Sequence, residues 1–125
     1  MKWNTFDPNC PTRQLLDRVG DKWTVLVLAV LARQPTRFGE LRRSVGGVAP
    51  KVLTSVLRSL ERDGFVRRQV YPASPLRVEY SLTPLGRSLA EVVERLQGWT
   101  EKQMTRVVKA REQYDAGSKQ RSLPV

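Results

Sequence analysis

The pattern of apolar positions in the first third of the chain predicts two helices. In residues 10–20 an apolar stripe follows helical spacing. It consists of Leu15, Leu16 and Val19. Pro11 suits the first position of this helix and Gly20 suits its end. Residues 21–33 are apolar nearly all round, which is typical of a helix buried on most sides, and Asp21 can cap it.

Two shorter amphipathic helices follow, joined by a turn that contains Gly46 and Gly47. The first covers residues 38–45. Its inward positions are Phe38, Leu41 and Val45. The second covers residues 50–63, beginning at Pro50, and is closed by Gly64. Its inner stripe is Leu53, Val56, Leu57 and Leu60, and its outer face is Lys51, Thr54, Ser55, Arg58 and Arg62.

After residue 64 the helical period gives way to strand-like segments. Residues 65–71 are rich in β-forming residues, and residues 77–82 alternate strictly between apolar and polar. The Pro-rich stretch between them predicts the turn of a hairpin.

Thr83 and Pro84 then open a long helix, which we expect to continue to about Arg111 with a weak point at Gly98. Its apolar face is Leu85, Leu89, Val92, Val93, Leu96 and Trp99. We therefore expect a single domain over residues 1–113 and a flexible basic tail over residues 114–125.

This order of elements is that of a winged helix-turn-helix, mainly α with a small β-hairpin. A DNA-binding helix-turn-helix joins two helices by a short turn that often contains Gly. The second of them, here residues 50–63, would lie in the major groove, and the hairpin would be the wing.

The amino-acid composition of the chain excludes several classes of function. The chain has 125 residues, enough for one domain, with 22 basic against 12 acidic residues and a net charge of +10. This balance favours a polyanionic partner, nucleic acid first and an anionic membrane second. The chain has no His and a single Cys, so His-based catalysis, Cys-cluster zinc sites and an intramolecular disulfide are excluded. We find no nucleophile–base pair or phosphate loop, and expect neither an enzyme nor a cofactor.

The longest apolar run, residues 23–32, is too short to span a bilayer, which takes about 20 residues. The N-terminus carries no apolar signal core. We therefore expect a cytoplasmic protein without a membrane partner.

The basic charge is concentrated on the helix-turn-helix and wing. Residues 34–80 hold nine basic and four acidic side chains, a net charge of +5, whereas residues 81–99 sum to zero. The expected contacts to base edges are Lys51, Thr54, Ser55 and Arg58, because Lys and Arg donate to guanine and hydroxyls serve several bases. The expected contacts to DNA phosphates are Arg37, Arg42, Arg43 and Arg62, with Arg77 on the wing placed for phosphate or the minor groove.

A series of short motifs, in order along residues 10–100, carries a specific resemblance. They are Cys10-Pro11, Gly20 to Thr24, Arg37 to Arg43, Leu53-Thr54, Leu57 to Gly64, Val70 to Pro72, Pro75 to Tyr80, and Leu82 to Gly86. The chain resembles the HxlR-type family of bacterial winged-helix transcriptional regulators. The resemblance implies a homodimer on a pseudo-palindromic operator near its own or a neighbouring promoter, with the first and last helices as dimer interface.

One departure from that family concerns the start of the fourth helix, where Ala49-Pro50 replaces the usual polar pair. Proline keeps the helix start but removes an N–H that could meet a phosphate. An architectural protein that coats DNA with little sequence preference is the alternative to a sequence-specific regulator.

The domain is too small to cover the whole apolar stripe of its last helix. We therefore predict a dimer interface that includes Leu15, Leu89, Val92, Leu96 and Trp99. Trp23 and Trp99 are expected to pack in the core or the dimer interface. The alternative is that they line a small apolar pocket at that interface, which would bind a small ligand.

Cys10 has two open interpretations. The positive end of a helix favours the thiolate, Arg13 lies one turn further on and Asp7 opposes. The resemblance implies that some members sense oxidants or electrophiles through a Cys near this place. The alternative, which the shared Cys-Pro motif favours, is a structural residue. With one Cys, any oxidation switch must be an intermolecular disulfide, a mixed disulfide with a small thiol, or a sulfenic acid.

Overall fold

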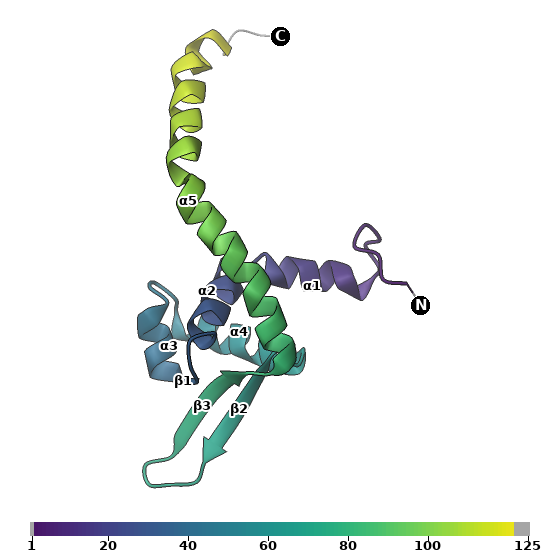
Figure 1. The fold of residues 1–125 in the computed structure, drawn as a ribbon, viewed down its shortest axis with the longest axis vertical. Helices are drawn as coiled ribbons and strands as arrows, with labels where there is room; N and C mark the ends of the chain where they lie inside the picture. The colour runs from purple at the N-terminus through teal and green to yellow at the C-terminus, as the bar shows by residue number, and fades with distance from the viewer. Residues whose placement is uncertain (1, 122–125) are drawn as a thin grey trace. The chain divides into compact units, whose positions relative to one another are not determined.

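The computed structural model describes residues 2–121, and the chain divides into two compact units between residues 94 and 95. The first unit contains helices α1 (Pro11–Val19), α2 (Lys22–Leu31), α3 (Phe38–Ser44) and α4 (Pro50–Arg62) and strands β1 (Thr36–Arg37), β2 (Val66–Tyr71) and β3 (Arg77–Leu82) (Figure 1). Helix α5 (Pro84–Arg121) contributes residues 84–94 to the first unit, and the second unit begins at residue 95. The predicted order of four helices, a hairpin and a long helix is confirmed.

Local signals in the sequence determine both ends of α1 and the start of α2. Pro11 occupies the first turn of α1 and Gly20 caps its end. The Asp21 side chain accepts a hydrogen bond from the Thr24 backbone N–H at 3.3 Å, so Asp21 caps α2 as expected. Helix α2 ends at Leu31, two residues before the expected Arg33, with Ala32 as its C-cap.

The core lies where α2, α3 and α4 pack together. The inner stripe of α4 is almost fully buried at Leu53, Leu57 and Leu60, and Val56 is half-buried at its edge. The residues packed with that stripe in one apolar cluster include Val27, Leu28, Leu31, Leu41 and Val45. Burial of these side chains supplies the main driving force for folding.

The turn between α3 and α4 requires a glycine at one position. Gly47 has φ +85°, a left-handed conformation that side chains with a Cβ rarely adopt. Val45 and Val48, on either side of the glycine pair, are buried and hold the turn against the core. The two helices of the helix-turn-helix are therefore fixed relative to one another.

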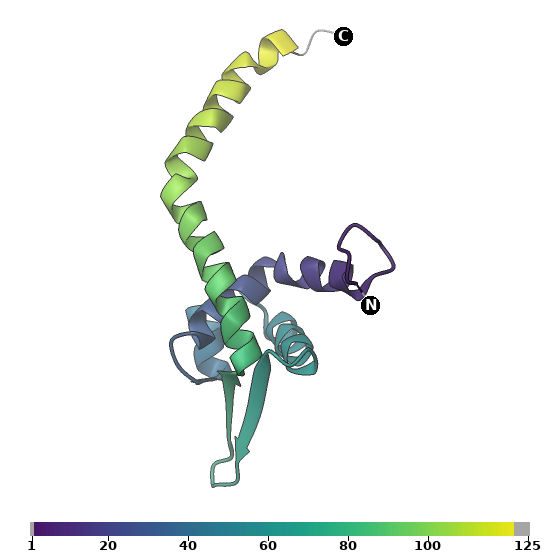
Figure 2. The same ribbon diagram turned by 45° about the vertical axis from the view of Figure 1, so that its right-hand side comes forward.

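The β-structure is a three-stranded antiparallel sheet in the order β1-β3-β2. The β2–β3 hairpin matches the prediction and extends away from the helices (Figure 2). Strand β1 was not predicted, because two residues are too few to show an alternating pattern. It pairs with β3 through Thr36 opposite Tyr80 and Arg37 opposite Glu79.

The start of α5 is tied to the start of the hairpin. The Thr83 hydroxyl donates to the Gly64 carbonyl at 2.6 Å and accepts from the Gly86 N–H at 3.0 Å. A Cβ at Gly86 would lie 1.9 Å from the Phe65 carbonyl oxygen, so only glycine fits there. Ala90 and Val93, on the following turns, are buried.

Helix α5 is longer than expected. It continues through Gly98 and past Arg111 to Arg121, so residues 114–121 are helical where we expected a tail. Residues 122–125 of that expected tail lie outside the described part of the chain. The extension is rich in Ala, Glu, Gln, Lys and Arg, which favour helix, and the isolated Gly98 and Gly117 do not break it.

Helix α1 contributes little to the core, since none of its residues is buried. The Arg18 guanidinium donates to the Asp63 carboxylate just beyond the end of α4, and both side chains are partly shielded from solvent. This ion pair joins the first helix to the end of the second helix of the helix-turn-helix.

Among residues 2–121, no helix combines the length and the apolar character that crossing a membrane requires.

Two glycine substitutions in α5 test the contact between α5 and the hairpin. Gly86→Ala should destabilise the fold by about 3 kcal/mol, because its Cβ collides with backbone atoms of Phe65 that cannot move independently. Gly98→Ala is the matched control: nothing lies within 4 Å of its Cβ, and better helix propensity should stabilise it by up to about 1 kcal/mol. Urea unfolding followed by circular dichroism measures both. Equal stability of Gly86→Ala and the wild type would contradict the close approach.

Candidate nucleic-acid interface

The outer face of α4 presents basic and hydroxyl side chains to solvent. Lys51, Ser55, Arg58 and Arg62 are exposed, as expected. Lys51, Ser55 and Arg58 also line a shallow hollow of about 400 Å³, together with Thr54 and Ser59. This face can contact base edges and phosphates because the opposite side of the helix is occupied by the core.

Thr54 differs from the other expected base contacts. Its side chain is half-buried, and its hydroxyl donates to the Pro50 carbonyl at 2.9 Å. The hydroxyl proton is therefore committed to the helix backbone, and only the oxygen lone pairs can meet a donor from DNA. The helix begins without a side-chain cap at Ala49.

The basic residues before α4 lie on β1 and α3. Arg37, Arg42 and Arg43 are all exposed. The Arg43 Nη2 atom lies 3.9 Å from Glu40 Oε1, a contact between exposed side chains that solvent screens. All three guanidiniums are therefore accessible to an anionic partner.

On the wing, Arg77 is held by an aromatic ring. Its guanidinium carbon lies 4.2 Å from the centroid of the Tyr71 ring, directly across the hairpin, and its side chain is half-buried. This cation–π contact limits the conformations of Arg77 before any ligand arrives. The two other wing arginines, Arg67 and Arg68, are exposed.

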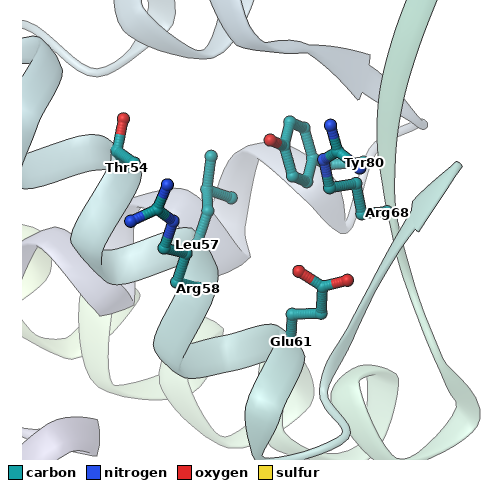
Figure 3. A pocket seen from close by; sticks show the side chains of 6 residues that line it. All are labelled: Thr54, Leu57, Arg58, Glu61, Arg68 and Tyr80. Atoms are coloured by element: carbon teal, nitrogen blue, oxygen red, sulfur yellow. The ribbon is translucent and has the colours of Figure 1, made fainter. Parts of the chain in front are cut away.

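A second hollow lies between α4 and the wing, with a volume of about 350 Å³ (Figure 3). Thr54, Leu57, Arg58 and Glu61 line it from α4, and Arg68 and Tyr80 from the strands. We did not select Glu61, Arg68 or Tyr80 from the sequence. The strand alternation alone places Arg68 and Tyr80 on a face, but only the register of β2 with β3 and the packing of α4 bring them opposite Arg58.

Cys10 occupies the N-cap position of α1 without a side-chain capping hydrogen bond, and its sulfur lies in a polar environment. Its sulfur accepts hydrogen bonds from the Thr12 hydroxyl at 3.1 Å and from the Asn4 N–H at 3.3 Å. These two contacts, the Thr12 hydroxyl first, lower the pKa of the Cys10 thiol below its ordinary value, while the Asp7 carboxylate opposes the shift. Arg13, which we expected to favour the thiolate, is not among the causes of the lowered pKa, and its guanidinium donates to the Phe6 carbonyl at 3.3 Å.

The residues expected at a dimer interface differ in exposure. Leu15 is 36% exposed and Val92 is 50% exposed in the first unit, and in the second unit Leu96 is 50% and Trp99 58% exposed. Leu89 is partly buried against the core of its own chain, so it contributes less free surface than we predicted. Trp23 also packs against the core, as expected.

Within the described residues, no group of three or more His, Cys, Asp or Glu side chains is placed to hold a metal ion.

Comparison with known proteins assigns the family. The model of the HxlR-like helix-turn-helix family matches residues 18–108. The helix-turn-helix-type transcriptional regulator YtfH of Escherichia coli (strain K12) is 44% identical over 110 residues, which is 88% of this chain and 87% of that protein.

Two solved structures are similar along most of their length. The transcriptional regulator ytfH from Salmonella typhimurium has a TM-score of 0.84 at 43% identity and covers 89% of this chain and 99% of its own. The redox regulator HypR in its reduced form has a TM-score of 0.72 at 36% identity, covering 79% of this chain and 98% of its own. The chain belongs to the HxlR-like helix-turn-helix family, whose members are winged-helix transcriptional regulators and not enzymes.

Proposed function

We propose that this regulator binds a specific, pseudo-palindromic DNA operator as a homodimer, acting in the cytoplasm. The observation that carries the proposal is the two-sided character of α4. Leu53, Leu57 and Leu60 are buried, so the opposite face with Lys51, Ser55 and Arg58 points to solvent. In a helix-turn-helix this face enters the major groove.

The basic side chains outside α4 support the same placement. Arg37, Arg42 and Arg43 precede the recognition helix and Arg77 follows it on the wing, so cationic groups flank the helix on both sides in the chain. Such contacts to phosphates set the position of the helix without selecting the sequence.

Dimerisation supplies the second half-site. The exposed apolar side chains of α5, including Val92, Leu96 and Trp99, are costly to leave in water. A twofold dimer buries the same surface of both copies and presents two recognition helices about 34 Å apart, which matches successive major grooves.

Cys10 is proposed as the site of an oxidant or electrophile response. The hydrogen bonds from Thr12 and Asn4 raise the fraction of reactive thiolate, and Cys10 lies at the start of α1, beside the predicted interface. HypR, one of the similar structures, is a redox regulator described in reduced and oxidized forms.

The central experiment is selection of bound DNA from a random-sequence pool, followed by footprinting on the DNA that flanks the protein's own gene. A regulator should prefer the selected sequence over competitor DNA by about a thousandfold or more. Equal affinity for all sequences would favour the architectural alternative.

Two arginine variants separate base contacts from phosphate contacts. Arg58→Ala should cost about 1–3 kcal/mol on the operator and relax the preference at one base pair. Arg43→Ala should weaken binding to every sequence alike and lower the slope of log affinity against log salt by about one. Fluorescence anisotropy on operator and scrambled DNA measures both. If Arg58→Ala loses the same affinity on both DNAs, Arg58 is not a base contact.

Charge on α5 should disrupt the dimer. Leu96→Lys and Trp99→Lys each place an ammonium in the predicted interface, where it would lose its hydration, so light scattering should report monomers. Leu76→Lys is the control, because Leu76 is at least as exposed as Leu96 and Trp99 but lies at the wing tip, and this variant should remain dimeric. Dimers in both α5 variants would place the interface elsewhere.

The pH dependence of alkylation tests the environment of Cys10. Since the pKa is lowered, the rate of reaction with iodoacetamide should rise at a lower pH than for an ordinary thiol. Thr12→Val removes the largest cause and should move the profile to higher pH, whereas Thr12→Ser keeps the hydroxyl and should leave it unchanged. Coincident profiles for wild type and Thr12→Val would contradict the assignment.

The proposed role of Cys10 in sensing oxidants is tested on the wild type and on Cys10→Ser. Diamide or a quinone should release the wild type from its operator in a gel shift and leave Cys10→Ser bound. Full affinity of the wild type after complete thiol modification would make Cys10 structural.

A further inference from the structure

The hollow between α4 and the wing is lined by an arginine without an ion-pair partner among the described residues. This arginine is Arg68, and it lines the hollow together with Tyr80, its partner across the hairpin (Figure 3). The Tyr80 ring packs against the core cluster, while its hydroxyl end is turned toward the side of the hollow formed by Thr54 and Arg58. A charged donor and a neutral donor therefore line one concave surface.

The strand register selects which wing arginine reaches this hollow. Arg68 is paired with Tyr80 across the hairpin, and both line the surface facing α4. Arg67 is paired with Ser81, and alternation along the strand directs it to the opposite face. Two adjacent, exposed arginines thus differ mainly in the face of the hairpin that they occupy.

We propose that the hollow is a cradle for a backbone phosphate of the DNA strand that bounds the major groove, with Arg68 and Tyr80 as its donors. This inference rests on the proposed function, which places α4 in that groove. The groove is lined on both sides by phosphates, so a wing lying beside the recognition helix must face the backbone. A guanidinium matches phosphate geometry, and the phenol adds a neutral hydrogen bond.

Glu61 limits the affinity of the cradle for phosphate. Its carboxylate lines the same hollow and forms no ion pair with a described residue, so it repels a bound phosphate. The repulsion acts on any DNA sequence, because the backbone is the same everywhere. Glu61 therefore lowers non-specific affinity while the base contacts of α4 are left unchanged.

Four variants, measured by anisotropy on the selected operator and on scrambled DNA, test the cradle. Arg68→Ala should lower affinity about tenfold on both DNAs and reduce the salt slope by about one. Arg67→Ala, the matched control, should change affinity by less than about twofold. Tyr80→Phe should lower affinity by roughly threefold, the loss of one neutral hydrogen bond. Glu61→Gln should raise affinity on both DNAs by roughly threefold.

A scan of single methylphosphonate substitutions, which remove one phosphate charge at a time, locates the contact. At one backbone position the wild type should lose about tenfold in affinity, and Arg68→Ala should lose nothing further there. Circular dichroism confirms that each variant is folded, and Arg68→Lys, which keeps the charge, should retain most of the affinity.

Two results would overturn the cradle. The first is an equal loss of affinity in Arg67→Ala and Arg68→Ala. The second is a scan in which Arg68→Ala loses affinity at every phosphate position where the wild type does. Failure of the proposed function is distinct, because the wild type would then show no preferred sequence. Even in that case the slope of log affinity against log salt can be measured on random DNA for Arg67→Ala and Arg68→Ala. A smaller slope for Arg68→Ala alone would support the cradle independently of sequence preference.

Discussion

Burial of the inner stripe of α4 is the constraint on which the rest of the molecule depends. Leu53, Leu57 and Leu60 pack among the apolar residues of α2 and α3. This packing fixes the orientation of α4 about its own axis. The basic side chains on the other face are then directed outward, beside the Thr54 hydroxyl that donates to the Pro50 carbonyl of the same helix. The exposed basic face of α4 is therefore a consequence of core packing.

The wing depends on the same core through a few backbone contacts. Gly86 lies against the Phe65 carbonyl, and the Thr83 hydroxyl donates to the Gly64 carbonyl just before β2 and accepts from the Gly86 N–H of α5. Because these contacts hold both ends of the hairpin, the strands extend from a fixed base beside α4. The hollow lined by Arg58, Arg68 and Tyr80 exists only because helix and wing are held in this relation.

The pKa of the Cys10 thiol depends on the neighbours that the fold brings to the sulfur more than on spacing along the sequence. Arg13 was the nearest cation in the sequence, yet its guanidinium is used by the Phe6 carbonyl. The residues before α1 fold back so that the Asn4 N–H reaches the sulfur, and Thr12 supplies the stronger donor. A neutral hydroxyl and a backbone amide thus lower the thiol pKa, an effect that we had expected from the charge of Arg13.

The sequence by itself determined the type and order of the elements and the outward basic face of α4, because periodicity and capping residues act locally. The capping residues Asp21 and Thr83 also marked the starts of α2 and α5, which begin at the next residue in each case. The tertiary structure alone decided the short strand β1, the use of the Thr54 hydroxyl by its own helix, and the meeting of Arg68 and Tyr80 with α4. Helix α5 passed its expected end because helix-forming residues outweighed two isolated glycines. The remaining features depend on strand register and on packing between segments far apart in the chain, and neither leaves a local pattern in the sequence.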